Sequence, residues 1–232
     1  GSLAPTSTER MAAVARQLLL RHGVVMGETA VAEGVEGGFS GVYQVLTAME
    51  AAGKVRRGYF VGGTGGAQFA TSEAVEMLRS MREPPAAPQA VMLATTDPAN
   101  PYGAIARWPE GKEGPVDGPP RQSTLRPTPR GPTRVAGANV VLVDGDATGY
   151  LKRGDRDLLL FPPPEEPLRS LAVREVARAL LRLSASREPG RRGLLIATIN
   201  LGPATSHPLA HLFVDEGFVT GAMGLQARPP KR

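Results

Sequence analysis

The sequence predicts an α+β protein: a winged helix of three to four helices and a β-hairpin, followed by a mixed, β-rich α+β module or partial β-barrel. Three observations lead to this fold class. Helical patterns closed by glycine fill residues 6–53, a hairpin pattern with a glycine-rich turn fills 54–71, and short strands alternate with amphipathic helices across 138–232. We therefore expect a winged-helix domain at 1–83 and an α+β module of order βββαβαβ at 138–232, joined by residues 84–137.

The composition is that of a globular protein with a basic character. The chain has 232 residues, of which 41% are hydrophobic and 21% charged, enough for one or two domains. A net charge of +5 and a pI of about 10.0 favour a polyanionic partner. Nearly all the basic residues are arginines, which suit bidentate contacts with phosphate or guanine. The base composition of a genome can also produce many arginines, so the charge alone does not identify the partner.

Several kinds of chemistry are excluded by what the sequence lacks. The chain has no cysteine, which rules out disulfides, cysteine zinc fingers, iron–sulfur clusters and thiol catalysis. It has no GxxxxGK[ST], HExxH or GxSxG motif, so no cofactor is expected in this chain. The sequence has no apolar run of about 18 residues, so no membrane partner is predicted and a cytoplasmic location is expected.

No side chain stands out as catalytic, and the catalytic residues stay unknown. Several carboxylates are available for acid or base chemistry: Asp97, Asp144, Asp146, Asp155, Asp157 and Asp215. Most lie in predicted turns, where aspartate is common for backbone reasons. His207 and His211 have a spacing that can hold a metal, but no third ligand lies near them, so no metal site is predicted.

The first helix is expected from Thr6 to about His22. Thr6 and Glu9 form a capping box ahead of apolar residues at helical spacing, and Gly23 ends the pattern. A short second helix is expected over residues 26–33.

The central helix is expected to end at Gly53. Its apolar residues recur every three or four positions and define one buried face: Phe39, Val42, Val45, Leu46 and Met49. After it, Val55, Tyr59 and Val61 alternate with other residues, and the GGTGG turn at 62–66 reverses the chain into a second strand. A helix followed directly by such a hairpin is typical of a winged helix, in which the helix enters a DNA groove and the wing contacts the backbone.

The predicted DNA-binding residues lie on this helix and hairpin. They are Ser40, Tyr43, Gln44 and Thr47 on the helix, and Lys54, Arg56, Arg57 and Thr64 in the hairpin. The cations at the base of the hairpin indicate contacts with the DNA backbone. Two alternatives remain: a winged helix that binds another protein, and a cation cluster that is only a solvated face.

A fourth helix is expected from Ser72 until the PPAAP sequence ends it. The helix runs through Val75, Met77, Leu78 and Met81, and it is expected to pack on the back of the winged helix.

The segment 84–137 begins with a predicted strand at residues 91–95 and a proline-set turn. Arg107 and Trp108 follow, and they are added to the candidate DNA-binding residues because a tryptophan can stack on a base. The alternative is that Trp108 belongs to a core. Residues 109–134, rich in proline, glycine and arginine, predict a mobile loop whose basic half contacts phosphates, or a passive linker.

The second module is expected to contain seven further elements. These are strands at 140–144, 148–152 and 158–161, a helix at 168–184, a strand at 194–199, a helix at 208–216 and a closing strand at 218–225.

Three motifs occur together in this chain: GKVRRGYF at 53–60, GGAQFA at 65–70 and DPANPYG at 97–103. With the meander and the chain ending that follow, they resemble the C-terminal region of the large helicase-related (Lhr) family of bacterial superfamily 2 DEAD/DEAH helicases. The resemblance covers nearly the whole chain except residues 109–134.

The resemblance implies tandem winged helices and a β-barrel-like module that follow an ATPase core, in a protein that unwinds DNA during repair. ATP and Mg would serve that core, because this chain lacks every ATPase motif. The implied partners are single-stranded or duplex DNA, the helicase core of the same polypeptide and, in a homo-oligomer, a second copy. Gly1 and Ser2 in place of a starting Met look like an expression scar, so a fragment of a longer protein is expected.

Two other functions remain open. Such C-terminal regions are similar to winged-helix DNA glycosylases, which makes a uracil-type glycosylase activity one alternative. The Q-hydrophobic-Q signature of the alkyl-base glycosylases is missing, since Gln68 has no glutamine two residues away, and this argues against independent base excision. The other alternative is an oligomerisation or interdomain assembly module.

Overall fold

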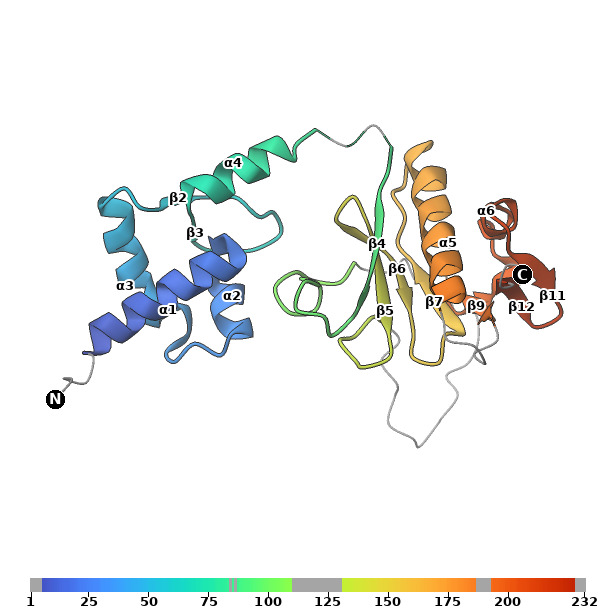
Figure 1. The fold of residues 1–232 in the computed structure, drawn as a ribbon, viewed down its shortest axis with the longest axis horizontal. Helices are drawn as coiled ribbons and strands as arrows, with labels where there is room; N and C mark the ends of the chain where they lie inside the picture. Colours follow the sequence, from blue (N-terminus) through green and yellow to red (C-terminus); the bar gives the residue numbers. More distant parts are fainter. Residues whose placement is uncertain (1–5, 84, 86, 110–130, 187–192, 228–232) are drawn as a thin grey trace, which may run out of the picture. The chain divides into compact units, whose positions relative to one another are not determined.

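A computed structural model describes residues 6–83, 85, 87–109, 131–186 and 193–227. The chain divides into two compact units (Figure 1). The first comprises Gly1–Pro84 with Ala104–Ala106, and the second comprises Pro85–Gly103 with Arg107–Arg232. In the described residues, no helix is both long and apolar enough to cross a membrane.

The first unit is a winged helix, as predicted. Its elements are α1 (Ser7–His22), β1 (Val24–Val25), α2 (Gly27–Ala32), α3 (Gly38–Ala51), β2 (Arg56–Gly58), β3 (Gln68–Ala70) and α4 (Ser72–Ser80). The capping box of Thr6 and Glu9 starts α1, and Gly23, in a positive-φ conformation that glycine adopts without strain, ends it. Apolar residues of α1, α3 and β3 share one core, which includes Leu18, Leu46 and Phe69.

The sheet of this unit contains a strand that the sequence did not reveal. Its order is β1-β3-β2, with both pairs antiparallel. Strand β1 is only two residues long, and it pairs with β3 more than 40 positions later in the chain. A two-residue strand has no periodicity of its own, so only its distant partner defines it.

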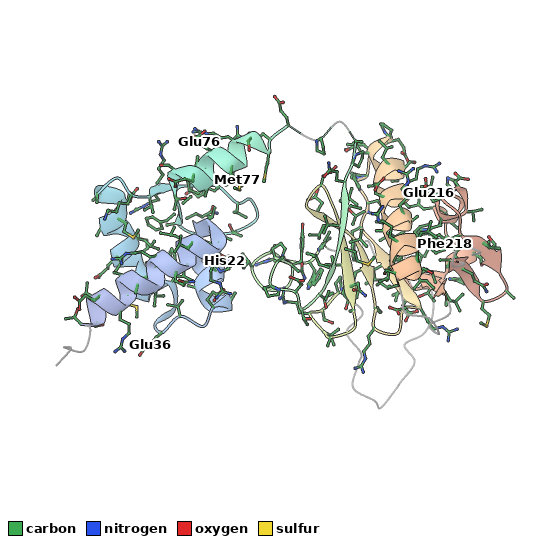
Figure 2. All side chains as sticks on the ribbon, in the orientation of Figure 1. His22, Glu36, Glu76, Met77, Glu216 and Phe218 are labelled. Carbon is green, nitrogen blue, oxygen red and sulfur yellow. The ribbon has the colours of Figure 1, made fainter. Side chains whose placement is uncertain are left out.

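Helix α4 packs less closely than predicted. Val75 is 7% exposed and contacts Val24 and Ala70, but Met77 and Met81 are 60% and 68% exposed. Met77 is labelled on α4 in Figure 2. Helix α4 thus contacts the winged helix through Val75, whereas its later apolar side chains are exposed. The small cluster beneath α4 reaches only the first turn of the helix.

The second unit is an open sheet covered by a long helix. Its strands are β4 (Ala90–Ala94), β5 (Asn139–Val143), β6 (Asp146–Leu151), β7 (Asp157–Leu160), β8 (Leu194–Ile196), β9 (Thr198–Ile199), β10 (Gly202–Pro203), β11 (Val219–Gly221) and β12 (Gly224–Ala227). Its helices are α5 (Leu168–Ser186), the 3-10 turn η1 (Ala204–Ser206) and α6 (Ala210–Asp215). A six-stranded sheet has the order β10-β9-β7-β6-β5-β4, and a three-stranded sheet has the order β11-β12-β8. Neither sheet closes into a barrel among the described residues, so the module is α+β with open sheets.

The meander β5-β6-β7 and the helix α5 lie where the sequence predicts them. The buried side of α5 packs on the six-stranded sheet through an apolar core that includes Val176, Leu180 and Leu158 (Figure 1). This core also includes residues of α6 and β12, which makes it the larger of the two main cores in the described structure.

Two predicted single strands are each divided in the structure. Residues 194–199 form β8 and β9, which belong to different sheets, because the backbone at Ala197 and Thr198 turns to donate N–H groups to the Arg156 carbonyl (2.7 and 3.2 Å). Residues 218–225 turn between β11 and β12, where Gly224 has φ +134° and a Cβ would collide with the Ile196 carbonyl.

Candidate nucleic-acid interface

The outer side of α3 carries small and uncharged polar side chains. Ser40 and Gln44, one turn apart, are exposed. Val42 and Leu46, on the opposite side, are fully buried against the core shared with α1. Ser40 and Gln44 are therefore accessible to a ligand.

Arg57 is held by partners inside the winged-helix unit. Its guanidinium donates to the Tyr43 hydroxyl (3.4 Å) and to Thr47 Oγ1 (3.3 Å). It also forms an ion pair with Glu50 (2.6 Å) and lies 5.0 Å from the centre of the Phe69 ring. Arg57 thus links β2 to α3, and the hydroxyl groups of the half-buried Tyr43 and Thr47 accept its hydrogen bonds.

Lys54 and Arg56 differ from Arg57. Both are exposed, and their side chains make no ion pair or hydrogen bond with a residue that the structure describes. Arg56 lies opposite Ala70 in the strand register and Arg57 opposite Phe69, so the two side chains project from opposite faces of the sheet. The predicted cluster of three cations is therefore divided, and only Lys54 and Arg56 are available to an anionic ligand.

A buried glutamine organises the wing loop, which we define as residues 59–67. Gln68 Oε1 accepts the N–H groups of Phe60 (2.7 Å) and Val61 (2.8 Å). Gln68 Nε2 donates to the Val61 carbonyl (2.9 Å) and to Thr64 Oγ1 (2.8 Å). The Thr64 hydroxyl in turn donates to the Val61 carbonyl (2.9 Å). Thr64, a predicted DNA contact, thus serves the loop itself. No local pattern indicates the role of Gln68 beyond its place in a hairpin.

Tyr59 is the residue that the sequence reasoning missed. The alternation of Val55, Tyr59 and Val61 predicts that the Tyr59 ring lies on the same face of the strand as the two valines. In the structure, however, Tyr59 is 92% exposed. Val55 is buried and Val61 is partly buried. Strand β2 ends at Gly58, and the alternation ends with it.

Arg107 and Trp108 belong to the second unit. Trp108 stacks on Tyr102 with ring centres 5.8 Å apart and meets the edge of Tyr150 at 5.5 Å. It is partly buried in a small cluster with Tyr150 and Leu159, which favours the alternative that Trp108 is a packing residue. Arg107 is exposed.

Arg134 supports the turn that contains Asn100. Its guanidinium donates to the carbonyls of Asn100 (2.6 Å), Tyr102 (3.4 Å) and Asp97 (3.2 Å). The prediction of a mobile loop over 109–134 falls mostly on residues outside the described ones. At its end, Arg134 is engaged with the protein's own backbone.

The positive charge is distributed unequally between the units. Residues 1–84 contain eight Lys or Arg and eight Asp or Glu, so the excess of +5 comes from residues 85–232. Any attraction of the winged helix for a polyanion must therefore come from the local arrangement of its cations.

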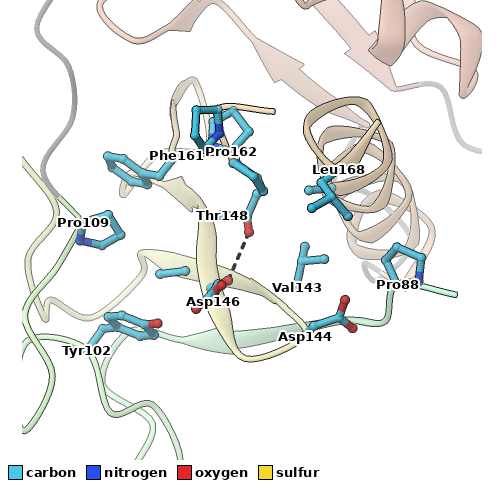
Figure 3. Close-up of a pocket in the computed structure, with 14 residues that line it drawn as sticks. Pro88, Tyr102, Pro109, Val143, Asp144, Asp146, Thr148, Phe161, Pro162 and Leu168 are labelled. Atoms are coloured by element: carbon cyan, nitrogen blue, oxygen red, sulfur yellow. Dashed lines mark hydrogen bonds between the residues drawn. The ribbon is translucent and has the colours of Figure 1, made fainter. Parts of the chain in front are cut away.

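The second unit contains a groove of about 500 Å³ (Figure 3). It is lined by two aspartates and by prolines, aromatic residues and aliphatic side chains: Pro88, Tyr102, Pro109, Val143, Asp144, Asp146, Ala147, Thr148, Phe161, Pro162, Pro163, Pro164, Leu168 and Ala172. Asp144 accepts the Gln89 N–H (2.9 Å), whereas the Asp146 carboxylate has no hydrogen-bond or ion-pair partner among the described residues. Burial raises the pKa of the Tyr102 hydroxyl, and the charge of Asp146 raises it further.

The side chains of His207 and His211 lie close to backbone groups of their own segment. His207 Nδ1 accepts the Leu209 N–H (3.2 Å), and His211 Nδ1 lies 2.9 Å from the Pro208 carbonyl. Burial lowers the pKa of His207. In the described part of the chain, no three His, Asp or Glu side chains come together as metal ligands.

The chain is similar to known proteins of one family. The family model described as "Large helicase-related protein, winged-helix domain" matches residues 4–90. A Mycolicibacterium smegmatis protein named "Lhr helicase/ probable uracil glycosylase" is 44% identical over 201 residues, which are 84% of this chain and 12% of that protein. An Escherichia coli protein named "Lhr helicase/uracil glycosylase" is 33% identical over 226 residues, which are 94% of this chain and 13% of that protein.

The chain thus spans about an eighth of the length of these relatives, and the similarity extends over both of its units. It belongs to the large helicase-related family, and its residues 4–90 are matched as a winged-helix domain of that family.

Proposed function

We propose that the winged-helix unit binds DNA through α3 and the wing, and that it supports substrate engagement by a repair helicase whose ATP-driven core lies outside this chain. One observation carries the proposal. Ser40 and Gln44 are exposed on α3, with no side-chain hydrogen bond to another described residue, and the hairpin that follows exposes Lys54 and Arg56. ATP and Mg²⁺ are expected only at the helicase core, because the chain has no phosphate-binding loop.

The local geometry refines the expected contacts. Lys54 and Arg56 would neutralise phosphates, whereas Ser40 and Gln44 would lie near bases or sugars. Arg57, Tyr43, Thr47 and Thr64 would support this surface from behind, because their polar groups already bind one another or the wing loop. With two available cations on a neutral unit, binding is expected to be weak and strongly dependent on salt.

The test is fluorescence anisotropy of the whole chain with labelled single-stranded and duplex DNA across a salt series. The double variant Lys54→Ala with Arg56→Ala is expected to bind about 10-fold more weakly and to reduce the salt slope by roughly 2, since each phosphate contact contributes about 0.9. Arg16→Ala with Arg82→Ala removes two exposed cations elsewhere on the unit and should leave both quantities unchanged.

Two outcomes would contradict the proposal. Unchanged binding by the Lys54 and Arg56 variant would move the DNA site away from the wing. An absence of binding by the unsubstituted chain would favour an assembly module, and self-association measured by light scattering would then support that function.

We infer a second candidate function, uracil-type base excision in the second unit, from the Asp146 carboxylate in the groove. A carboxylate can take a proton from water while the water oxygen bonds to the sugar carbon and the bond to a flipped base breaks. The names of both relatives include this activity.

Release of free uracil from a uracil-containing oligonucleotide tests this function. Asp146→Asn should abolish release, whereas Asp144→Asn should retain most of it, because the Asp144 carboxylate already holds the Gln89 N–H. No release by the unsubstituted chain would exclude the activity from this segment.

A further inference from the structure

We propose that Tyr59 is a stacking platform for an unpaired nucleobase, so that the wing recognises the place where a duplex opens into a single strand. The inference rests on the proposed DNA binding by α3 and the wing, and it adds the class of DNA that this surface takes. Its starting observation is a large aromatic ring that is 92% exposed on the wing loop.

The fold holds Tyr59 outward. Phe60 and Val61, which follow it directly, pack on a cluster with Val24 and Ala70 under α4. The Phe60 ring also folds over Gly58, where a Cβ would lie 2.9 Å from the ring. The residues on both sides of Tyr59 are thus placed against the unit, and the Tyr59 ring projects into solvent.

The wing loop is fixed in this position by polar contacts as well. Gln68 binds the backbone N–H groups of both Phe60 and Val61, so the chain immediately after Tyr59 has a defined conformation. A tyrosine has only two side-chain torsions to order, which keeps the entropic cost of binding through its ring low. Tyr59 is therefore a nearly free ring on a structured support.

The glycines of the wing loop point to an external ligand. Gly63 and Gly66 have positive φ values (74° and 81°), which explains why glycine occupies these two positions. Gly62 and Gly65 do not have this requirement, and a Cβ on either would meet no atom within 4 Å. Their lack of a side chain has no internal explanation, but it would let a DNA backbone approach the amide groups of the loop closely.

The exposed Tyr59 ring is suited to bind an unpaired base rather than a base inside a duplex. Bases inside a duplex are already stacked on both faces, whereas an unpaired base or the last base of a duplex has a free face. An aromatic ring can stack on that face whatever the base. Arg56, on the strand that leads to the loop, is available to the adjoining phosphates.

The test compares binding of the whole chain to a blunt duplex and to the same duplex with an unpaired arm. Tyr59→Ala should weaken binding to the forked DNA about 10-fold and change binding to the blunt duplex little, because stacking is lost only where a free base face exists. Tyr59→Phe keeps the ring and should bind as the unsubstituted chain does. Leu20→Ala, which removes an exposed apolar side chain from α1, is the matched control.

A spectroscopic readout separates stacking from other contributions. With 2-aminopurine at the first unpaired position, stacking on Tyr59 should quench its fluorescence on binding, and Tyr59→Ala should abolish the quenching at saturating protein. Gly62→Ala with Gly65→Ala should weaken binding to both DNAs without a change in unfolding temperature.

The outcomes distinguish this inference from the proposed function. If Tyr59→Ala binds and quenches like the unsubstituted chain while the Lys54 and Arg56 variant loses affinity, the stacking platform is wrong and the DNA interface stands. If the unsubstituted chain binds neither DNA, both are wrong.

Discussion

In the second unit, Arg174 and Arg178 pair with Asp215, Glu216 and Glu175, whereas in the winged helix Lys54 and Arg56 have no such partners among the described residues. The pairs with Asp215 and Glu216 join α5 to the end of α6 at 2.7 to 3.1 Å, and the pair with Glu175 lies within α5. Arg178 and Arg174 hold the pKa of Glu216 below its ordinary value of 4.5 by hydrogen bonding to it. The second unit uses these charges to hold its own elements together.

In the winged helix, one short strand contains both an arginine that is paired within the protein and an arginine that is not. Arg57 is engaged by Glu50 and two hydroxyl groups, while Arg56, the residue before it, is exposed to solvent. Side chains that the fold itself employs are poor candidates for a ligand, because their contacts would have to be broken first. The better candidates for contact with a ligand are therefore the exposed side chains of the hairpin: Lys54, Arg56 and Tyr59.

The largest expected effect concerns the apolar core of the second unit. Leu180→Ala should lower the free energy of unfolding of that unit by about 2–5 kcal/mol, because Leu180 is fully buried on the inner side of α5. Trp108, the only tryptophan, lies in this unit, so its fluorescence during urea unfolding reports on the second unit alone. DNA binding should be unaffected, and a loss of affinity would show that the two units are not independent.

Gln68→Leu is the corresponding test of the winged helix. It should cost about 2–4 kcal/mol, because the N–H groups of Phe60 and Val61 lose their acceptor. The change should appear in far-ultraviolet circular dichroism, which reports on both units, but not in Trp108 fluorescence. Gln17→Leu, at an exposed position of α1, is the control. A shift in both signals would contradict the division into two units.

A smaller effect is expected from Glu216→Gln in the ionic cluster. At neutral pH the substitution should destabilise the second unit by about 1 kcal/mol, since Arg174 and Arg178 lose a charged acceptor. Because the folded-state pKa of Glu216 is lowered, its contribution is present above the ordinary value of 4.5 and disappears as the pH falls through the folded-state pKa. Unfolding curves of the two proteins should therefore converge in acid. Glu165→Gln, at an exposed carboxylate, is the control at neutral pH, and a constant difference for Glu216→Gln across the pH range would contradict the charge argument.

The smallest expected effect concerns Glu50, whose ion pair distinguishes Arg57 from Arg56. Glu50→Gln should change stability by less than about 0.5 kcal/mol, because the ion pair with Arg57 is about one-third exposed. It should raise DNA affinity about two- to fivefold by leaving Arg57 without a neutralising charge. Anisotropy titrations at low salt measure the gain, and weaker binding would indicate that Glu50 positions Arg57 for DNA.

The elements with clear periodicity could be predicted from the sequence. Helices α1, α3 and α5 and the meander β5-β6-β7 lie within a few residues of their expected bounds, because capping residues, glycine stops and apolar spacing are local signals. The exposed positions Ser40 and Gln44 also follow from helical spacing. DNA contact by these residues stays a prediction.

Other features depended on residues far apart in the chain. Strand β1 is defined only by its pairing with β3. Residues 194–199 divide into two strands because the N–H groups of Ala197 and Thr198 bind the Arg156 carbonyl, which places the second half of the segment in another sheet. No local pattern contains these partners.

The sequence by itself thus determined the winged helix, the mixed second module and their order, since these depend on spacing within short segments. Only the tertiary structure decided that Arg57 is engaged, that Gln68 secures the wing loop and that Tyr59 is exposed. The physical reason is that a side chain's availability depends on which groups the folded backbone brings to it. Arg57 and Arg56 are adjacent and chemically identical, but they lie on opposite faces of one strand, and of the two only Arg57 has polar partners among the described residues.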